Sequence, residues 1–377
     1  MRVVMLSSKE PQCGIASYTR DFNQPLSGLV DLDYQSFPKI EDGQGWEQLS
    51  QYLNQRADMV HIQYHPQFCG YWRTPSLTHT FNRFLNSLKI PSVITVHDLL
   101  DQDFFEPRGS FLKTLIQRKL LSFFLHHTGY GIFLRGGFLK PGTHFVAHWK
   151  KTESGLLRLG IKKEDITVLY PGIPDTSQAN AFNERFESFY KNHRVIGMLG
   201  FLRQDKGYDW MLEVLRRLPQ DVCLLALGGA AHGNEGYAQQ LQSKAKDLGL
   251  ENRFMISGCL PDDETLPLLK RCQLIVLPYD YRHHTASYAL SCVMSVHRPI
   301  LVSDMEYFAE IKSLCHSLSI YDRKNLESLY SAVLENIEKK EIPDFNQDPF
   351  YQEWTWMAIS KKMIGIYQRL LNQRVKK

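Results

Sequence analysis

The sequence contains no apolar run long enough to cross a membrane. No stretch free of charged residues reaches the roughly 20 residues that a spanning helix needs, and the mean hydropathy is −0.31. The apolar run near the N-terminus, Val3 to Leu6, is too short for the hydrophobic core of a signal peptide. The absence of a spanning run excludes a multispan membrane protein, and the short N-terminal run is typical of a first buried strand.

Paired cysteines are missing as well. The seven cysteines stand singly, without a C-x-x-C pair, and no N-x-S/T glycosylation acceptor occurs. An odd, dispersed set of thiols argues against a disulfide framework or a zinc ribbon. A reducing compartment fits this pattern best.

Several familiar catalytic motifs are absent. The chain has no P-loop, no G-x-G-x-x-G after its first apolar run, no H-E-x-x-H and no G-x-S-x-G. Two D-x-D triplets, Asp31–Asp33 and Asp101–Asp103, could hold a divalent metal beside a diphosphate. Because this triplet is common, it carries little weight, and we predict no metal site.

The chain has 377 residues, of which 43% are hydrophobic and 22% charged. This is enough apolar material for the hydrophobic cores of two domains. Short apolar runs alternate with longer amphipathic segments, which is typical of parallel sheets covered by helices on both faces. The expected strands of the first half are 2–6, 59–63, 92–96, 130–134, 144–147 and 166–169, with helices over 77–88 and 111–125.

The second half repeats this alternation. Its expected strands are 194–199, 222–227, 253–257, 274–277 and 299–302, with helices over 210–217, 237–248, 264–271 and 288–296. Between the halves, the punctuation by Pro and Gly around Tyr170 to Pro174 predicts a linker over 173–193. We therefore expect an α/β protein with two doubly wound parallel-sheet domains, 1–172 and 194–350, facing each other across a cleft, and a terminal segment over 351–377.

The net charge of +4 is small for a nucleic-acid binder, but it is unevenly distributed. Residues 108–163 contain eleven basic residues and a single acidic one, Glu153. Such a face suits an anionic membrane surface or an anionic acceptor, and the basic, apolar helix over 111–125 suits interfacial binding. The alternatives are a solvated basic face and a core-packing helix with its basic residues outside.

Two loops of the first half follow expected strands. Gly14 lies between a strand and a helix, where a glycine lets the backbone approach a ligand and the helix N-terminus favours an anion. His97 ends a strand, where its imidazole could donate to a sugar hydroxyl or to developing negative charge. The alternatives are a simple turn glycine and a structural histidine.

In the second half, Arg203 and Lys206 follow a strand and stand beside Gly207. Arginine supplies a planar fork and lysine a point charge, so the pair could clamp a diphosphate and stabilise the negative charge of a leaving group. The alternative is a surface turn with two solvated charges.

A fourth loop, from His283 to Leu290, enters a helix that Ser287 or Thr285 could cap. The amides of Ser287, Tyr288 and Ala289 could bind phosphate oxygens there. An ordinary N-cap is the alternative.

Taken together, these segments resemble the retaining GT-B-fold glycosyltransferases of family 4, also called glycosyl transferases group 1, over nearly the whole chain. Each mark is weak alone, and their order and spacing carry the resemblance. In the first half the marks are Gly14-Ile-Ala16, Asp58-Met-Val-His61, Thr95-Val-His-Asp98 and Tyr170-Pro-Gly-Ile173. In the second half they are Gly200 to Gly207, Phe254 to Leu260, Leu274 to Pro278, Arg298 to Ser303 and Trp354-Thr-Trp356.

The resemblance implies a GT-B fold whose C-terminal helix crosses back to the first domain, and it implies roles for the loop residues. Arg203 and Lys206 would hold the diphosphate of a UDP- or GDP-sugar, and His97 would contact the sugar near the reacting carbon. Backbone at Gly258 and Leu260 would receive the base. The other implied donor contacts are Gly14, His284, Ser287, Tyr288 and Ala289. Such enzymes need no metal or other cofactor and retain anomeric configuration, with the leaving phosphate as base.

One departure from the family pattern concerns the donor sugar. Many members carry two glutamates, eight residues apart, at the positions of His284 and Cys292. Some branches use a Ser-rich version, which Ala286 to Leu290 resembles. The resemblance therefore leaves ribose contact and sugar choice open, and His284 is our candidate for a hydrogen bond to a sugar hydroxyl.

The sequence thus predicts a transferase that moves a hexosyl group from a nucleotide-diphosphate sugar to a glycan, lipid-linked or other hydroxyl acceptor in polysaccharide biosynthesis. It would act in the cytoplasm, or at the inner membrane face through residues 108–163, without a nucleic-acid partner. The main alternative is a catalytically silent subunit acting with a partner, which the missing glutamates favour and the retained Arg203 and Lys206 oppose. An epimerase or phosphorylase of the same fold has no supporting motif.

Overall fold

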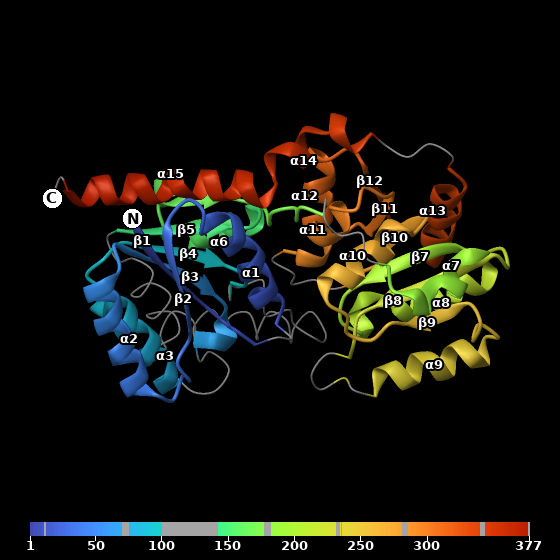
Figure 1. The fold of residues 1–377 in the computed structure, drawn as a ribbon, viewed down its shortest axis with the longest axis horizontal. Helices are drawn as coiled ribbons and strands as arrows, with labels where there is room; N and C mark the ends of the chain where they lie inside the picture. The colour runs from blue at the N-terminus through green and yellow to red at the C-terminus, as the bar shows by residue number, and fades with distance from the viewer. Residues whose placement is uncertain are drawn as a thin grey trace, which may run out of the picture. The chain divides into compact units, whose positions relative to one another are not determined.

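The computed structural model describes residues 1–10, 13–69, 75–99, 142–176, 182–230, 234, 236–280, 286–339 and 344–375. They form two compact units, Met1–Gly172 with Trp356–Lys377, and Ile173–Thr355 (Figure 1). Each unit is built on a six-stranded parallel sheet, which confirms the expected α/β class. The strand expected over 130–134, the helix expected over 111–125 and the triplet Asp101–Asp103 lie outside the described residues.

The sheet of the first unit has the order β2-β1-β3-β4-β5-β6. Its strands are β1 (Arg2–Ser7), β2 (Asp31–Ser36), β3 (Met59–Tyr64), β4 (Ser92–Val96), β5 (Thr143–Ala147) and β6 (Ile166–Val168). Its helices are α1 (Gly14–Leu26), α2 (Gly43–Arg56), α3 (Pro75–Ser87), α6 (Lys150–Arg158) and the C-terminal α15 (Trp356–Val375), with a 3₁₀ turn over Pro66–Cys69 and another over Lys163–Asp165.

The two faces of this sheet differ in chemistry because alternate strand residues point to opposite sides. One face is apolar and packs against the aromatic side chains of α2 and α3, among them Trp46, Phe81 and Phe84. The other face lies beneath α1 and α15, which pack side by side (Figure 1). Placement of α15 in the first unit agrees with the helix that the resemblance expects to return there.

The sheet of the second unit has the order β12-β11-β10-β7-β8-β9. Its strands are β7 (Arg194–Leu199), β8 (Val222–Leu227), β9 (Phe254–Ile256), β10 (Leu274–Leu277), β11 (Ile300–Ser303) and β12 (Leu318–Tyr321). Its helices are α7 (Glu187–Lys191), α8 (Tyr208–Arg217), α9 (Tyr237–Asp247), α10 (Asp262–Lys270), α11 (Tyr288–Met294), α12 (Glu306–Leu314), α13 (Leu326–Glu338) and α14 (Pro349–Glu353).

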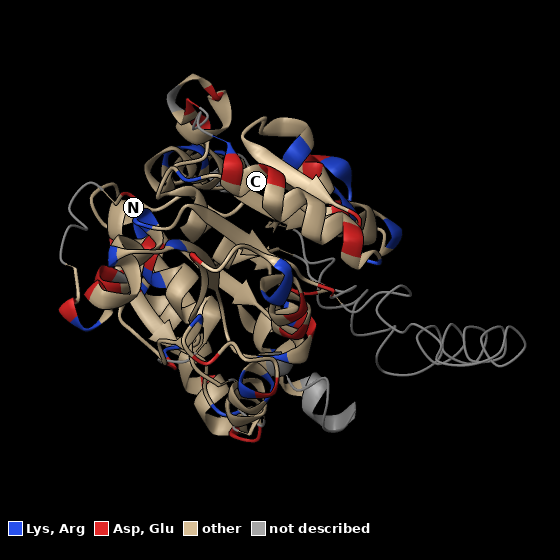
Figure 2. Ribbon diagram, turned by 90° about the vertical axis from the view of Figure 1, so that its right-hand side faces the viewer, with Lys and Arg blue, Asp and Glu red and all other residues tan. Residues whose placement is uncertain are grey.

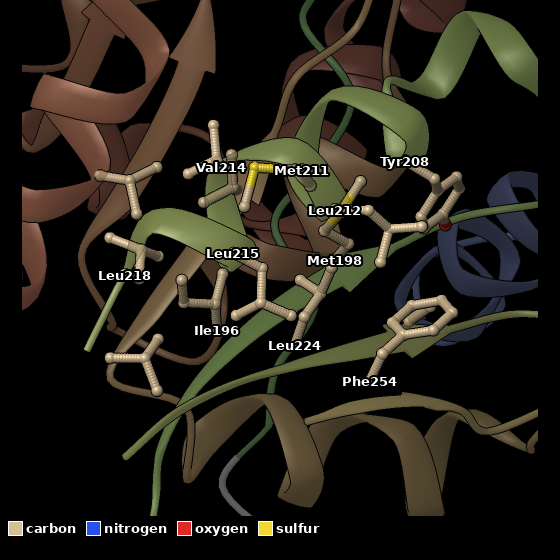
Figure 3. Packing of buried hydrophobic residues seen from close by; sticks show 14 of the residues in the cluster. Ile196, Met198, Tyr208, Met211, Leu212, Val214, Leu215, Leu218, Leu224 and Phe254 are labelled. Carbon is tan, nitrogen blue, oxygen red and sulfur yellow. The ribbon is translucent and has the colours of Figure 1, made fainter. Parts of the chain in front are cut away.

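The core of the second unit explains why α8 forms where it does. The apolar side chains of Met211, Leu212 and Leu215 recur at helical spacing and pack on Ile196 and Leu224 of the sheet (Figure 3). Arg216 and Arg217 occupy the last turn of α8, where positive charge complements the helix dipole. Full burial of each large apolar side chain contributes roughly 1.5–3 kcal/mol. This packing fixes the β7–α8 loop at one end.

The segment expected to be a linker differs from that expectation where the structure describes it. A 3₁₀ turn over Glu184–Phe186 leads into α7, and the side chains of Phe186, Phe189 and Tyr190 are buried. The Tyr190 hydroxyl donates to the Leu268 carbonyl at 2.8 Å. These aromatic anchors make the segment part of the second unit.

Candidate functional site

The chain order of the second sheet creates a meeting point of loops. Strand β7 is the first of the unit and lies between β8 and β10. The chain passes from β7 to β8 and β9 on one side and then crosses over to β10 on the other side, so the loops after β7 and β10 lie next to each other where the strand order reverses. Ligands of open α/β sheets bind at such a switch point, outside the carboxyl ends of the strands. The loops are joined here by backbone bonds: Asp280 N–H donates to the Asp205 carbonyl at 3.0 Å, and Leu202 N–H to the Gly229 carbonyl at 2.9 Å.

Two glycines allow these loops to approach so closely. At Gly207, with φ +75°, an added Cβ would lie 2.1 Å from the Pro278 carbonyl oxygen. At Gly228, with φ +151°, it would lie 2.1 Å from the Gly200 carbonyl oxygen. Both positions combine a backbone conformation that favours glycine with a contact that excludes any side chain. The close approach brings Lys206 against the loop after β10.

Lys206 is buried at this point, with only 8% of its surface exposed. Its ammonium lies 3.5 Å from the centre of the Tyr279 ring. Burial lowers the pKa of Lys206 to about 7, against an opposing effect of Asp205 and with a smaller lowering from Arg203. The structure therefore rules out the alternative of a solvated lysine at this position. An anion bound next to the Lys206 amine would favour its protonated form.

Arg203 stands at the start of the same loop and forms an ion pair with Asp205. Its Nε donates to Oδ1 of Asp205 at 2.9 Å, and Nη2 donates to Oδ2. Two parallel bonds of this kind fix the plane of a guanidinium. Asp205 was not among the sequence candidates, although its position between Arg203 and Lys206 is a local signal for such an orienting role.

Tyr279 also links this loop to the start of α11. Its hydroxyl donates to the Leu199 carbonyl at 3.2 Å and shares a side-chain hydrogen bond with Ser287. Ser287 is the N-cap of α11, since its Oγ accepts from Leu290 N–H at 3.2 Å. The structure thus brings Lys206 and Ser287 together through Tyr279, a residue that the sequence analysis did not single out.

The remaining residues of the α11 loop are placed in part. Tyr288 and Ala289 form the first turn of α11, and Cys292 is buried within the helix. His284, proposed above to contact the sugar, lies outside the described residues, as does Thr285.

Gly258 and Leu260 follow β9, next to the same edge. Gly258 has φ +74° and pairs with Gly228 in an isolated bridge. The Ser257 hydroxyl accepts from Gly228 N–H at 3.2 Å and donates to the Gly258 carbonyl at 2.7 Å. The Leu260 carbonyl accepts from the Thr265 hydroxyl at 3.4 Å, at the start of α10. Gly258 therefore adjoins the switch point.

In the first unit, His97 follows β4 and is half-buried among rings. Its ring centroid lies 4.7 Å from that of Tyr18 and 5.0 Å from that of His148. Its Nε2 lies 2.7 Å from Oε1 of Gln63. Burial lowers the pKa of His97 well below its usual value, and the neighbouring imidazoles, chiefly His148, add to this. His97 is therefore a neutral imidazole at neutral pH.

Gly14 begins α1, where Cys13 is the N-cap without a side-chain capping bond. A Cβ added at Gly14 would meet no atom within 4 Å in the described part of the chain. Gly14 has no left-handed backbone conformation, and a side chain would not clash with the described residues. The alternative, that glycine occurs here only because a turn requires it, therefore gains no support.

Two basic side chains in the described part of the segment 108–163 lie near carboxylates. Lys163 pairs with Glu153, and Lys162 lies 3.5 Å from Glu164. Blue Lys and Arg positions and red Asp and Glu positions are scattered along the ribbon of Figure 2. In the described ranges we find no group of three or more His, Cys, Asp and Glu side chains placed to hold a metal. No helix within those ranges is long and apolar enough to span a bilayer.

Known proteins resemble this chain in sequence and in fold. Residues 180–344 match the model of the family "Glycosyl transferases group 1". A mannosylfructose-phosphate synthase from Agrobacterium fabrum is 29% identical in an alignment of 133 positions that covers 32% of this chain. The chain thus spans only 29% of the length of that curated relative.

Solved structures are similar over nearly the entire chain. HepE from Anabaena, crystallised with UDP, has a TM-score of 0.71 at 16% identity and covers 98% of this chain and 100% of its own. Sucrose-phosphate synthase from Thermosynechococcus elongatus has a TM-score of 0.71 at 12% identity and covers 99% of this chain and 100% of its own. The chain therefore has the two-domain GT-B fold.

Proposed function

We propose that this protein is a retaining glycosyltransferase of family 4 that uses a nucleotide-diphosphate sugar. The observation that carries the proposal is the buried Lys206 on the Tyr279 ring, next to Arg203, at the switch point of the second sheet. Burial leaves the Lys206 amine partly neutral, and a diphosphate beside it favours the protonated form. The amine then stabilises the diphosphate more strongly as negative charge develops on it during transfer, which is what catalysis requires.

The proposed donor contacts follow from the loops around Lys206. Arg203 and Lys206 hold the diphosphate, with the amides of Ser287, Tyr288 and Ala289 at the start of α11 as further donors. Backbone at Gly258 and Leu260 receives the base. From the first unit, Gly14 faces the diphosphate and His97 the sugar, and His284 hydrogen-bonds a sugar hydroxyl.

The proposed reaction needs no carboxylate pair. The bond between the anomeric carbon and the diphosphate oxygen breaks, the acceptor hydroxyl oxygen bonds to that carbon on the same face, and its proton passes to the leaving phosphate. Arg203 and Lys206 stabilise the charge that develops on the diphosphate. We propose that the transfer requires no metal.

The donor and acceptor are proposed from different observations. A UDP-sugar as the donor is supported by the HepE structures, which were solved with UDP and with UDP-glucose. A GDP-sugar is the second candidate donor. The basic segment 108–163 supports an anionic, glycan or lipid-linked acceptor of polysaccharide biosynthesis, met at the cytoplasmic face of a membrane.

To test this proposal, the rate of transfer or of slow hydrolysis is measured with α-linked UDP- and GDP-sugars. Proton NMR identifies the anomeric configuration of the product as it first forms. We expect the α-anomer, and a rate reduced about 10²- to 10³-fold in Lys206→Ala. The surface variant Arg216→Ala removes a cation on α8 and should leave the rate unchanged. A β-product would contradict retention.

The alternative is a catalytically silent subunit, favoured by His284 and Cys292 at the two glutamate positions. It predicts nucleotide binding without transfer to any acceptor, and transfer only after a partner protein is added.

A further inference from the structure

A buried polar path crosses the first unit beneath α1 and α15, on the sheet face opposite the apolar core. It contains His61 and Gln63 of β3, both fully buried, and Tyr367 of α15. The Tyr367 hydroxyl lies 2.5 Å from His61 Nδ1, and the Gln63 amide oxygen lies 2.7 Å from His97 Nε2. The path therefore ends at the histidine that the proposed function places beside the donor sugar.

The atoms around the Gln63 amide nitrogen determine the orientation of the amide group. Its Nε2 lies 3.1 Å from the sulfur of Met5 and 3.4 Å from His61 Nε2. A thioether sulfur accepts hydrogen bonds and cannot donate them. The NH₂ group therefore faces Met5, and the carbonyl oxygen faces His97.

This orientation determines the tautomer of His97. A carbonyl oxygen only accepts, so His97 Nε2 must carry the proton and donate it to Gln63. In a neutral imidazole the other nitrogen then bears a lone pair. Within the described residues, Nδ1 of His97 has no hydrogen-bond partner, and its ring is held edge-on by Tyr18 and against His148.

We propose that Gln63 is a positioning residue that fixes His97 in the Nε2–H tautomer, so that Nδ1 accepts a hydrogen bond from a ligand hydroxyl. The identity of that hydroxyl as one of the donor sugar rests on the proposed function. This assignment differs from the sequence expectation, in which His97 donates. It makes His97 selective for a hydroxyl over an oxygen that can only accept.

The tautomer is measured directly by NMR of protein with ¹⁵N-labelled histidine, in which long-range couplings separate protonated from unprotonated ring nitrogens. Comparison with His97→Gln assigns the His97 signals. We expect Nε2 protonated and Nδ1 unprotonated at neutral pH. The opposite tautomer would overturn the proposal, and this measurement needs neither donor nor activity.

Substitution of Gln63 supplies the second measurement. In Gln63→Met the acceptor is lost, so the single tautomer should give way to a mixture. Thr95→Val is the matched control. It removes a buried hydroxyl that lies 2.7 Å from His61 Nε2 and does not bond to the His97 ring, so it should leave the His97 tautomer unchanged. An unchanged tautomer in folded Gln63→Met would overturn the proposal; if that variant fails to fold, the wild-type spectrum decides.

If the proposed transfer activity is found, its rate provides a third measurement of how Gln63 acts on His97. We expect Gln63→Met to lower the transfer rate about 10- to 100-fold, as do other partners that orient a functional side chain. In a His97→Ala background, Gln63→Met should cause no further loss, because the ring that it positions is gone. Equal losses in both backgrounds would mean that Gln63 acts only on the fold. Absence of any transfer would count against the proposed function and would leave the tautomer result standing.

Discussion

The ammonium of Lys206 lies 3.5 Å from the centre of the Tyr279 ring and joins the loops after β7 and β10 at the switch point of the second sheet. Burial there lowers the pKa of Lys206 to about 7. A cation–π contact favours the charged form, but the loss of water outweighs it. A bound diphosphate would reverse this balance by placing negative charge beside the amine.

The first prediction concerns proton uptake on nucleotide binding. Below pH 7 the free Lys206 is already charged, whereas above pH 7 it is increasingly neutral and must take up a proton to pair with a diphosphate. We expect uptake near zero at pH 6, approaching one proton at pH 8, with affinity falling as pH rises. Calorimetry in buffers of different ionisation enthalpy measures this number. Lys206→Arg, which stays charged, should abolish the uptake; equal uptake in both proteins would contradict the assignment.

The second prediction concerns the glycine contact that seats Lys206. Gly207→Ala would bring a Cβ within 2.1 Å of the Pro278 carbonyl oxygen, and we expect the second unit to lose about 2–4 kcal/mol of stability. Gly249→Ala is the matched control, because Gly249 also has a positive φ, +67°, but its Cβ would meet nothing within 4 Å. That variant should lose only about 1–2 kcal/mol. Urea unfolding measures both, and equal losses would mean that backbone conformation alone requires the glycine.

The third prediction concerns acid stability. Burial lowers the pKa of His61 to about 3 and that of His148 to about 4. Between about pH 6.5 and 4 the unfolded chain therefore binds protons that the native protein does not, so stability falls as pH decreases. Each such histidine contributes up to about 1.4 kcal/mol per pH unit. In His148→Gln the slope of unfolding free energy against pH, measured by urea unfolding at several pH values, should decrease by up to this amount. An unchanged slope would contradict the assignment.

The fourth prediction concerns the attachment of α15. Tyr367→Phe removes the hydroxyl that lies 2.5 Å from His61 Nδ1 and leaves a buried nitrogen without that partner. We expect a loss of about 1–3 kcal/mol. Tyr52→Phe is the control, because it removes an exposed hydroxyl that bonds to Asp33 at 2.6 Å, and should cost less than about 1 kcal/mol. Similar losses in the two variants would show that the buried path adds nothing to the stability of the first unit.

Sequence patterns revealed the central strands of both sheets and also the edge strands β6 and β9. Strands such as β7 and β8 are buried on both faces and read as continuous apolar runs. The edge strands β2 and β12 escaped detection because neither contains a continuous apolar run: β2 has the sequence DLDYQS and β12 the sequence LSIY. Pairing with β1 along its whole length, rather than its own side chains, makes β2 a strand.

The candidate site was predictable only where the signal is local. Arg203, Lys206 and Gly207 are adjacent in sequence and follow an apolar run, so their loop could be recognised. Tyr279 could not, because its role comes from contacts with residues far away in the chain. The same holds for Gln63 and Tyr367, whose hydrogen-bond partners lie on other strands and helices.

The donor site is tested most directly by calorimetric titration of UDP, GDP, ADP and their common sugars. The proteins to compare are the wild type, Arg203→Ala, Lys206→Ala and the surface control Arg216→Ala. We expect one nucleoside diphosphate to bind the wild type and Arg216→Ala equally, and its affinity to fall at least tenfold in Arg203→Ala and in Lys206→Ala. Absence of binding by folded wild-type protein, or binding that neither site variant weakens, would contradict it.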